Sequence, residues 1–153
     1  MKKLAIMAVL AISAISASAT DLGLRAGRIG GVDTNAAGIA AVGVTVGQQF
    51  GVYGAELAFD RANVGTTNLD RYSLVGSYDV TKIAGATVAL NAGAAYIRPT
   101  IGTDGYAALV GVGISYPLTK TVSLVADYAY QAGQARVNAY NGNTVSIGTK
   151  YSF

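Results

Sequence analysis

Chemical function in this chain would rest on a small set of charged side chains, because the two most versatile residue types are missing. The 153 residues include no histidine and no cysteine, which excludes the commonest general base, the commonest metal ligand and any thiolate or disulfide site. Serine, aspartate and glutamate occur, but their spacing places no serine beside an activating base. No phosphate-binding glycine loop, metal cluster or nucleotide motif is visible. We therefore predict no enzyme activity, no catalytic residues, no cofactor and no metal site.

Four charged residues share a position that suggests an ion-pair cluster. Each lies about four to six residues from one end of an alternating segment, on the face with small and polar residues: Arg25, Glu56, Asp127 and Lys150. Two are positive and two negative, so they would form one balanced layer inside a closed sheet. If Gln131 and Thr144 pair, Lys150 lies diagonal to Asp127, within reach of a long side chain. Because a buried charge is costly unless it is paired, we predict a cluster that either gates an interior channel or only keeps the interior neutral.

These side chains would be positioned by segments that alternate between two faces, with the period of a β-strand. Between residues 122 and 131, for example, Val122 and Leu124 share one face, whereas Ser123 and Asp127 share the other. Similar segments recur near residues 22–29, 39–48, 52–60, 71–80, 86–97, 106–116 and 144–153. The pattern gives eight strands of about ten residues, the length that a tilted strand needs to cross a bilayer.

The connections between these strands alternate in length. Short turns are expected near residues 49–51, 81–85 and 117–121. Longer segments rich in Gly, Asn, Asp and Thr are expected near residues 30–38, 61–70, 98–105 and 132–143. Short turns at one end and longer loops at the other are typical of an outer-membrane barrel. We therefore predict an all-β chain that folds as an eight-stranded antiparallel up-and-down transmembrane β-barrel.

Aromatic residues mark both ends of the apolar face, as they do at the two interfaces of a bilayer. One set lies near the turns: Phe50, Tyr53, Tyr78, Tyr116, Tyr151 and Phe153. Another set lies near the loops: Phe59, Tyr72, Tyr96, Tyr106, Tyr128 and Tyr130. The opposite face is rich in glycine, which suits the narrow interior of a small barrel. The alternatives are a transmembrane helix at residues 34–55, which glycines interrupt, and a secreted soluble barrel whose aromatic residues fill its core.

Residues 1–19 have the three parts of a cleaved export signal. Met1-Lys2-Lys3 is positive, Leu4 to Ile15 is apolar, and Ala17-Ser18-Ala19 is a small-residue cleavage site. Cleavage would leave residues 20–153 as one barrel domain with nearly balanced charge, so we expect no binding of nucleic acid. The alternative is a short N-terminal membrane anchor, although the apolar segment is too short to span a bilayer well.

The sharpest local motif is the terminal strand, which ends Tyr151-Ser152-Phe153. Together with the alternating pattern of the whole mature chain, it resembles the eight-stranded outer-membrane barrel superfamily that includes the OmpA transmembrane domain, OmpX and the opacity-type adhesins. This resemblance implies a location in the bacterial outer membrane and an internal ion-pair network. It also implies that the barrel assembly machinery reads Tyr151 and Phe153 as its assembly signal, and that periplasmic chaperones are partners.

The remaining charged residues give two further expectations. Asp60 and Arg71 are expected to pair near the loop end of the interior. The loop-side rim of the outward face carries Arg28, Arg61 and Arg98. Because the planar guanidinium group suits phosphate, these arginines would contact lipopolysaccharide among the outer-membrane lipids, or else they are ordinary solvated rim charges.

Three classes of function stay open at this stage. The first is a structural barrel that maintains membrane integrity and has a narrow polar lumen. The second is a small pore for ions or solutes. The third is a surface-binding protein or adhesin that uses its loops, for which the segment 132–143 with Arg136 and Tyr140 is the best candidate, although the loops are short for that role.

Overall fold

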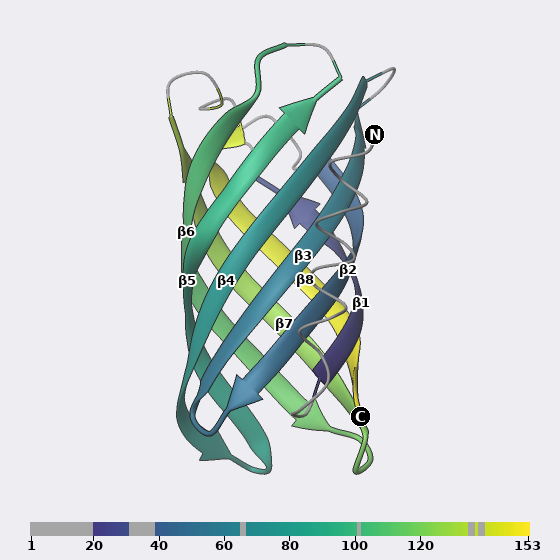
Figure 1. The fold of residues 1–153 in the computed structure, drawn as a ribbon, viewed down its shortest axis with the longest axis vertical. Coiled ribbons are helices and arrows are strands. Elements are labelled where there is room, and N and C mark those ends of the chain that lie inside the picture. The colour runs from purple at the N-terminus through teal and green to yellow at the C-terminus, as the bar shows by residue number, and fades with distance from the viewer. Residues whose placement is uncertain (1–19, 31–38, 65–66, 101, 135–136, 138–139) are drawn as a thin grey trace.

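In a computed structural model of the chain, eight antiparallel strands close into a single barrel, and the strands are tilted relative to its long axis (Figure 1). The structure describes residues 20–30, 39–64, 67–100, 102–134, 137 and 140–153. The predicted export signal at residues 1–19 and the loop residue Arg136 lie outside these ranges. The strands are β1 (Thr20–Ile29), β2 (Ile39–Phe50), β3 (Tyr53–Val64), β4 (Thr67–Ile83), β5 (Ala86–Pro99), β6 (Gly105–Pro117), β7 (Val122–Gly133) and β8 (Gly142–Ser152).

Each strand pairs with its neighbour in the sequence, and pairing of β1 with β8 closes the sheet. This order is the predicted up-and-down topology, and the predicted fold class is confirmed. Closure leaves no open sheet edge, so every strand finds backbone partners on both sides. Among the described residues, no helix is long and apolar enough to cross a membrane.

The two faces of the wall follow the alternation of the sequence. In β1, Leu22, Leu24 and Arg28 are exposed on the outside, whereas Gly23 and Arg25 between them are partly buried inside. The same alternation runs through β6, where tyrosine, valine and isoleucine point out and mainly glycine and alanine point in. A period of two therefore puts the large apolar residues outside and leaves small residues around a narrow interior.

The turns at one end of the barrel are tight. The β4–β5 turn is formed by Ala84 and Gly85, with φ angles of 51° and 87°, the left-handed pair that a two-residue hairpin requires. The β6–β7 turn is capped by Thr119, whose Oγ1 accepts hydrogen bonds from the backbone N–H groups of Thr121 and Val122 at 3.2 and 2.9 Å. The C-terminus lies at this same end (Figure 1).

At the other end, one of the expected loops is mostly strand and another is shorter than expected. The polar segment 61–70 continues β3 to Val64 and begins β4 at Thr67, and the segment 98–105 is shortened in the same way by β5 and β6. Polar side chains are typical of loops, but strand pairing continues into both segments, as in the Asn63–Asn68 pair. The strands at this end are therefore longer than the sequence pattern predicts.

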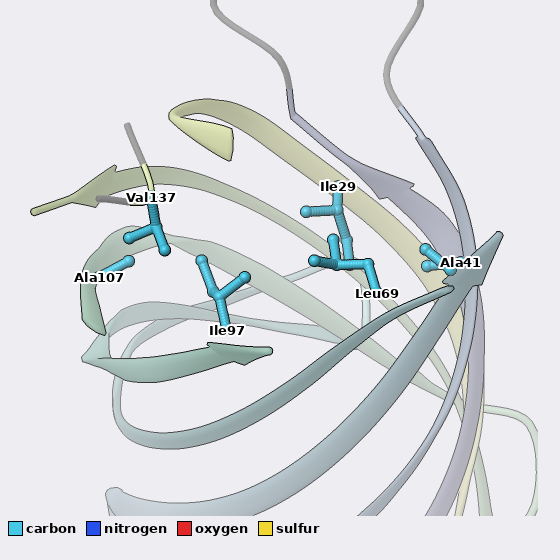
Figure 2. Close-up of a cluster of buried hydrophobic side chains, with 7 residues drawn as sticks. Ile29, Ala41, Leu69, Ile97, Ala107 and Val137 are labelled. Carbon is cyan, nitrogen blue, oxygen red and sulfur yellow. The ribbon is translucent and has the colours of Figure 1, made fainter. Parts of the chain in front are cut away.

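The interior differs from end to end. Buried apolar side chains fill the loop end and form what we call the apolar plug: Ile29, Ala41, Ala62, Leu69, Ile97, Ala107 and Val137 (Figure 2). The rest of the interior holds a cavity of about 470 Å³ that is lined by charged, polar and apolar residues and reaches the turn end at Gln49, Lys82 and Ser152. The lumen is thus wet at the turn end and apolar at the loop end.

Candidate functional site

The centre of the lumen is organised around the carboxylate of Asp60 on β3. Arg25 of β1 donates to both of its oxygens, from Nε at 2.7 Å and from Nη2 at 2.6 Å. Arg71, which faces Asp60 directly across the β3–β4 pair, donates from Nε at 3.0 Å. The side chains of Asp60 and Arg71 are each only 4% exposed. Two guanidinium groups therefore share one buried carboxylate in charge-assisted hydrogen bonds, one of them bidentate.

This arrangement requires a residue without a side chain on β2, the strand that lies between Arg25 and Asp60. In register, Arg25 faces Gly43 of β2, and Gly43 faces Asp60 of β3. A Cβ atom on Gly43 would overlap Oδ1 of Asp60. Because β2 contributes no side chain at this level, Arg25 can reach over it to a partner two strands away.

The network continues toward the turn end through Glu56 and Lys150. Arg25 Nη1 lies 3.5 Å from Glu56 Oε1, and Lys150 Nζ lies 3.2 Å from Glu56 Oε2. Lys150 also lies 4.0 Å from Asp21, whose carboxylate accepts a hydrogen bond from the Ser152 hydroxyl at 2.5 Å. These side chains line the cavity and retain contact with water.

Toward the loop end, the network passes from charged to neutral groups. Arg71 Nη1 donates to Gln131 Oε1 at 3.2 Å and to Thr144 Oγ1 at 3.4 Å. Gln131, which is fully buried, donates in turn to the backbone carbonyl of Tyr140 at 2.7 Å. We call the whole chain of contacts the ion-pair ladder: Asp21, Lys150, Glu56, Arg25, Asp60, Arg71, Gln131 and Thr144.

Asp127 does not join this ladder, and its predicted pairing with Lys150 is wrong. Gln131 pairs with Gly142 and not with Thr144, so that Lys150 faces Ser123 and Asp127 faces Ser146. The shift of two residues keeps both side chains inside the lumen but moves them out of diagonal contact. Among the described residues, the hydrogen bond that Asp127 receives comes from Asn91 of β5, at 3.2 Å.

The three rim arginines are all exposed on the outer face. Arg28 lies on β1, whereas Arg61 and Arg98 face the same residue, Asp70 of β4, from its two sides. Arg61 donates to both oxygens of Asp70, at 2.8 and 3.0 Å, and lies over the Phe59 ring. Asp70 is a functional candidate beyond the predicted site residues, and the alternation of its hairpin signals its outward position between two arginines.

Aromatic rings border the apolar band at both ends. On the loop side, Phe59, Tyr72, Tyr96 and Tyr106 form a continuous series across β3 to β6, with neighbouring ring centroids 5.0 to 6.5 Å apart. On the turn side, Tyr53 packs against Tyr78 at 5.4 Å, and Tyr151 packs edge-on against Phe153 at 4.9 Å. Exposed aliphatic side chains lie between the two borders: Leu57, Leu74, Leu90, Val110 and Val112. This is the outer surface that a bilayer requires of a barrel.

Solved structures share this architecture. The N-terminal β-barrel domain of Pseudomonas aeruginosa OprF matches 89% of this chain and 98% of its own, with a TM-score of 0.72 and 15% identity. Neisserial surface protein A matches 88% of this chain and 96% of its own, with a TM-score of 0.67 and 17% identity. A major outer membrane protein from Thermus thermophilus matches 90% of this chain and 100% of its own, with a TM-score of 0.67 and 15% identity.

The chain has the fold of the small eight-stranded outer-membrane barrels. The resemblance drawn from its terminal strand and alternating pattern is confirmed at the level of fold. The predicted location, the bacterial outer membrane, agrees with this fold and with the apolar band between two aromatic borders. No protein-family model matches the sequence, and no curated protein matches it either. These similarities therefore show the fold of the chain.

Proposed function

We propose that this outer-membrane barrel is a structural, membrane-integrity protein whose lumen does not conduct. The main support for the proposal is that side chains block the lumen of the barrel. At the level of Asp60 and Arg71 the lumen is occupied by side chains that are almost fully buried, and the apolar plug fills the space beyond them. The interior of an eight-stranded barrel is just wide enough for side chains to fill or for one small ligand to occupy.

The two alternatives fit the described residues less well. A pore needs a continuous wet path, whereas the cavity reaches only from the turn end to Arg71 and Thr144. An adhesin needs loops long enough to present a binding surface, whereas only residues 65–66 separate β3 from β4. The β7–β8 connection remains the best place for a contact, but the described part of it packs inward through Val137.

Recording from planar bilayers tests the proposal directly. Purified protein is first shown to be folded by its different gel mobility before and after boiling, and is then reconstituted. We expect no conductance steps above those of the bare membrane. Steady steps from the folded protein would instead favour the pore. In parallel, deletion of the gene from its host should increase sensitivity to detergents and bulky antibiotics, and re-expression of the chain should restore resistance.

We also propose that the rim arginines contact lipopolysaccharide phosphates. Arg98 is a stronger candidate than Arg61, because the guanidinium of Arg61 already binds Asp70 at 2.8 and 3.0 Å. A variant with Ala at all three positions should retain less lipopolysaccharide after purification, and Arg61→Ala alone should change retention less than Arg98→Ala. If the triple variant retained as much lipopolysaccharide as the parent, these arginines would be solvated rim charges.

A further inference from the structure

We propose that the apolar plug, and not the ion-pair ladder, is the barrier that closes the lumen, and that Val137 completes this plug. The inference rests on the proposed function, since it explains how a non-conducting lumen is closed. It assigns the closure to uncharged side chains at the loop end. The rest of the lumen is then a cavity that is closed at the loop end and that water and small solutes enter only from the turn end.

The position of the plug supports this assignment. Along β3, the next inward residue after Asp60 is Ala62, and along β4 the next inward residue beyond Arg71 is Leu69. Ala62 and Leu69 face each other in register, as do Asp60 and Arg71. On β3 and β4 the plug therefore begins at the next inward residue beyond the ladder, and on β5 the plug residue Ile97 faces Arg71 itself. Anything that passes the charged part of the ladder must still cross the plug.

The plug extends across the mouth of the barrel. Its members come from β1 to β6 and from the segment between β7 and β8, and their side chains point into the mouth (Figure 2). Ile29, Leu69, Ile97 and Val137 are each 1% exposed or less. Ile39 and Tyr140 pack against this group from its edge. Such an assembly excludes water in the way that hydrophobic constrictions close channels.

Val137 is fixed in place from three directions. A Cβ atom on Gly105 of β6 would lie 2.7 Å from its Cγ1, and a Cβ on Gly133 of β7 would lie 2.7 Å from its Cγ2. The absence of side chains at these two glycines forms a socket for the valine. Its backbone N–H donates to the Gln134 carbonyl at 2.8 Å, and its own carbonyl accepts from the Tyr140 N–H at 3.0 Å. The β7–β8 segment thus places an apolar side chain where β7 and β8 themselves supply glycine and polar residues.

The ladder is a weaker barrier because much of it lies in the wet part of the lumen. The side chains of Glu56 and Lys150 are 23% and 25% exposed and line the cavity. Charged groups that remain in contact with water can change partners and can solvate a passing ion. Buried aliphatic groups have no means of doing so, because they offer an ion no hydrogen-bonding partner.

Conductance of two sets of variants in planar bilayers separates the two barriers. The first set of variants alters the plug. Leu69→Ala combined with Ile97→Ala removes side-chain volume from it, and Val137→Ser alone introduces a polar hydroxyl group. The second set removes the Glu56–Lys150 ion pair from the wet part of the ladder without touching the plug: Glu56→Gln combined with Lys150→Met. A matched control makes the same kind of truncation on the lipid-facing surface, Leu74→Ala combined with Leu90→Ala. Each protein is recorded only after its gel mobility shows a folded barrel.

We expect conductance steps from both plug variants and none from the ladder variant, the control or the parent. Val137→Ser changes a single side chain and keeps the proposal testable if the double truncation does not fold. The proposal is overturned if folded plug variants stay silent, or if the ladder variant conducts as well. Conductance by the parent has a different meaning: it would contradict the closed lumen of the proposed function itself.

Discussion

Asp60 is the carboxylate on which the lumenal network depends most, and its replacement by asparagine should be strongly destabilising. Asp60 is the shared partner of Arg25 and Arg71, with contacts of 2.6 to 3.0 Å. Asparagine keeps the shape but loses the charge, which leaves two guanidinium groups close together with no anion between them. Removing one partner of a buried pair typically costs about 3–5 kcal/mol, and we expect a loss of unfolding free energy in that range.

The loss can be measured as a shift in the urea midpoint. The chain contains no tryptophan, so the folded fraction is best followed as the unboiled band on a gel after equilibration in lipid vesicles. If unfolding free energy falls by about 2 kcal/mol per molar urea, as is usual for small proteins, the midpoint of Asp60→Asn should fall by about 1.5–2.5 M. The double variant Asp60→Asn, Arg71→Met should recover part of this shift, because it removes one of the two uncompensated charges.

Asp70→Asn is the matched control for this experiment. Asp70 also binds an arginine through both of its oxygens, at 2.8 and 3.0 Å, but Arg61 is 54% exposed. Exposed ion pairs contribute little to stability because water and salt screen them, so the Asp70→Asn midpoint should match that of the parent. The reasoning is refuted if the two asparagine variants have equal midpoints, since burial would then not determine what these pairs contribute.

Three further predictions concern the wall and the ends of the chain. Gly93→Ala should fail to give a heat-modifiable barrel, because a Cβ atom there would overlap the Leu74 carbonyl oxygen. Gly76→Ala should fold normally, because the nearest atom to a Cβ there is the Ala92 carbonyl oxygen, 3.7 Å away. Equal folding of the two variants would contradict the steric argument. Phe153→Ala should slow the appearance of folded barrel in pulse-labelled cells, and an unchanged rate would remove this residue from the assembly signal. Sequencing of the mature N-terminus should begin at Thr20; Met1 would show that residues 1–19 are retained.

The strands and their faces could be predicted from the sequence because both depend on local alternation. A period of two assigns each residue to the inside or the outside once the direction of a single face is known. For this reason the inward positions of Arg25, Glu56 and Lys150 and the outward positions of the tyrosines agree with the structure. Asp60 and Arg71 could be paired for the same reason, since they belong to one hairpin whose two strands alternate up to the turn.

Contacts that depend on register across a long connection could not be predicted in the same way. The β7–β8 register differs by two residues from the assumed one, and a shift of two leaves every side chain on its face. Alternation therefore carries no information that would have separated the Lys150–Asp127 pair from the Lys150–Glu56 pair. The apolar plug could not be predicted for a different reason: Leu69 lies in a polar segment that is typical of a loop, and alternation alone does not show that inward Ile29 and Ile97 meet at one end of the lumen.

Glycines on the inner wall allow polar side chains to meet across an intervening strand, and their role can be recognised only once the register of the strands is known. Arg25 on β1 reaches Asp60 on β3 over Gly43 of β2, and Asn91 on β5 reaches Asp127 on β7 over Gly113 of β6. In both cases the polar contact skips one strand, and the strand that is skipped contributes no side chain at that level. A Cβ atom on Gly113 would lie 2.7 Å from Asp127 and 2.9 Å from Asn91. Such a glycine determines which polar groups can meet, so Gly43→Ala should weaken the Arg25–Asp60 contact even though it changes neither residue.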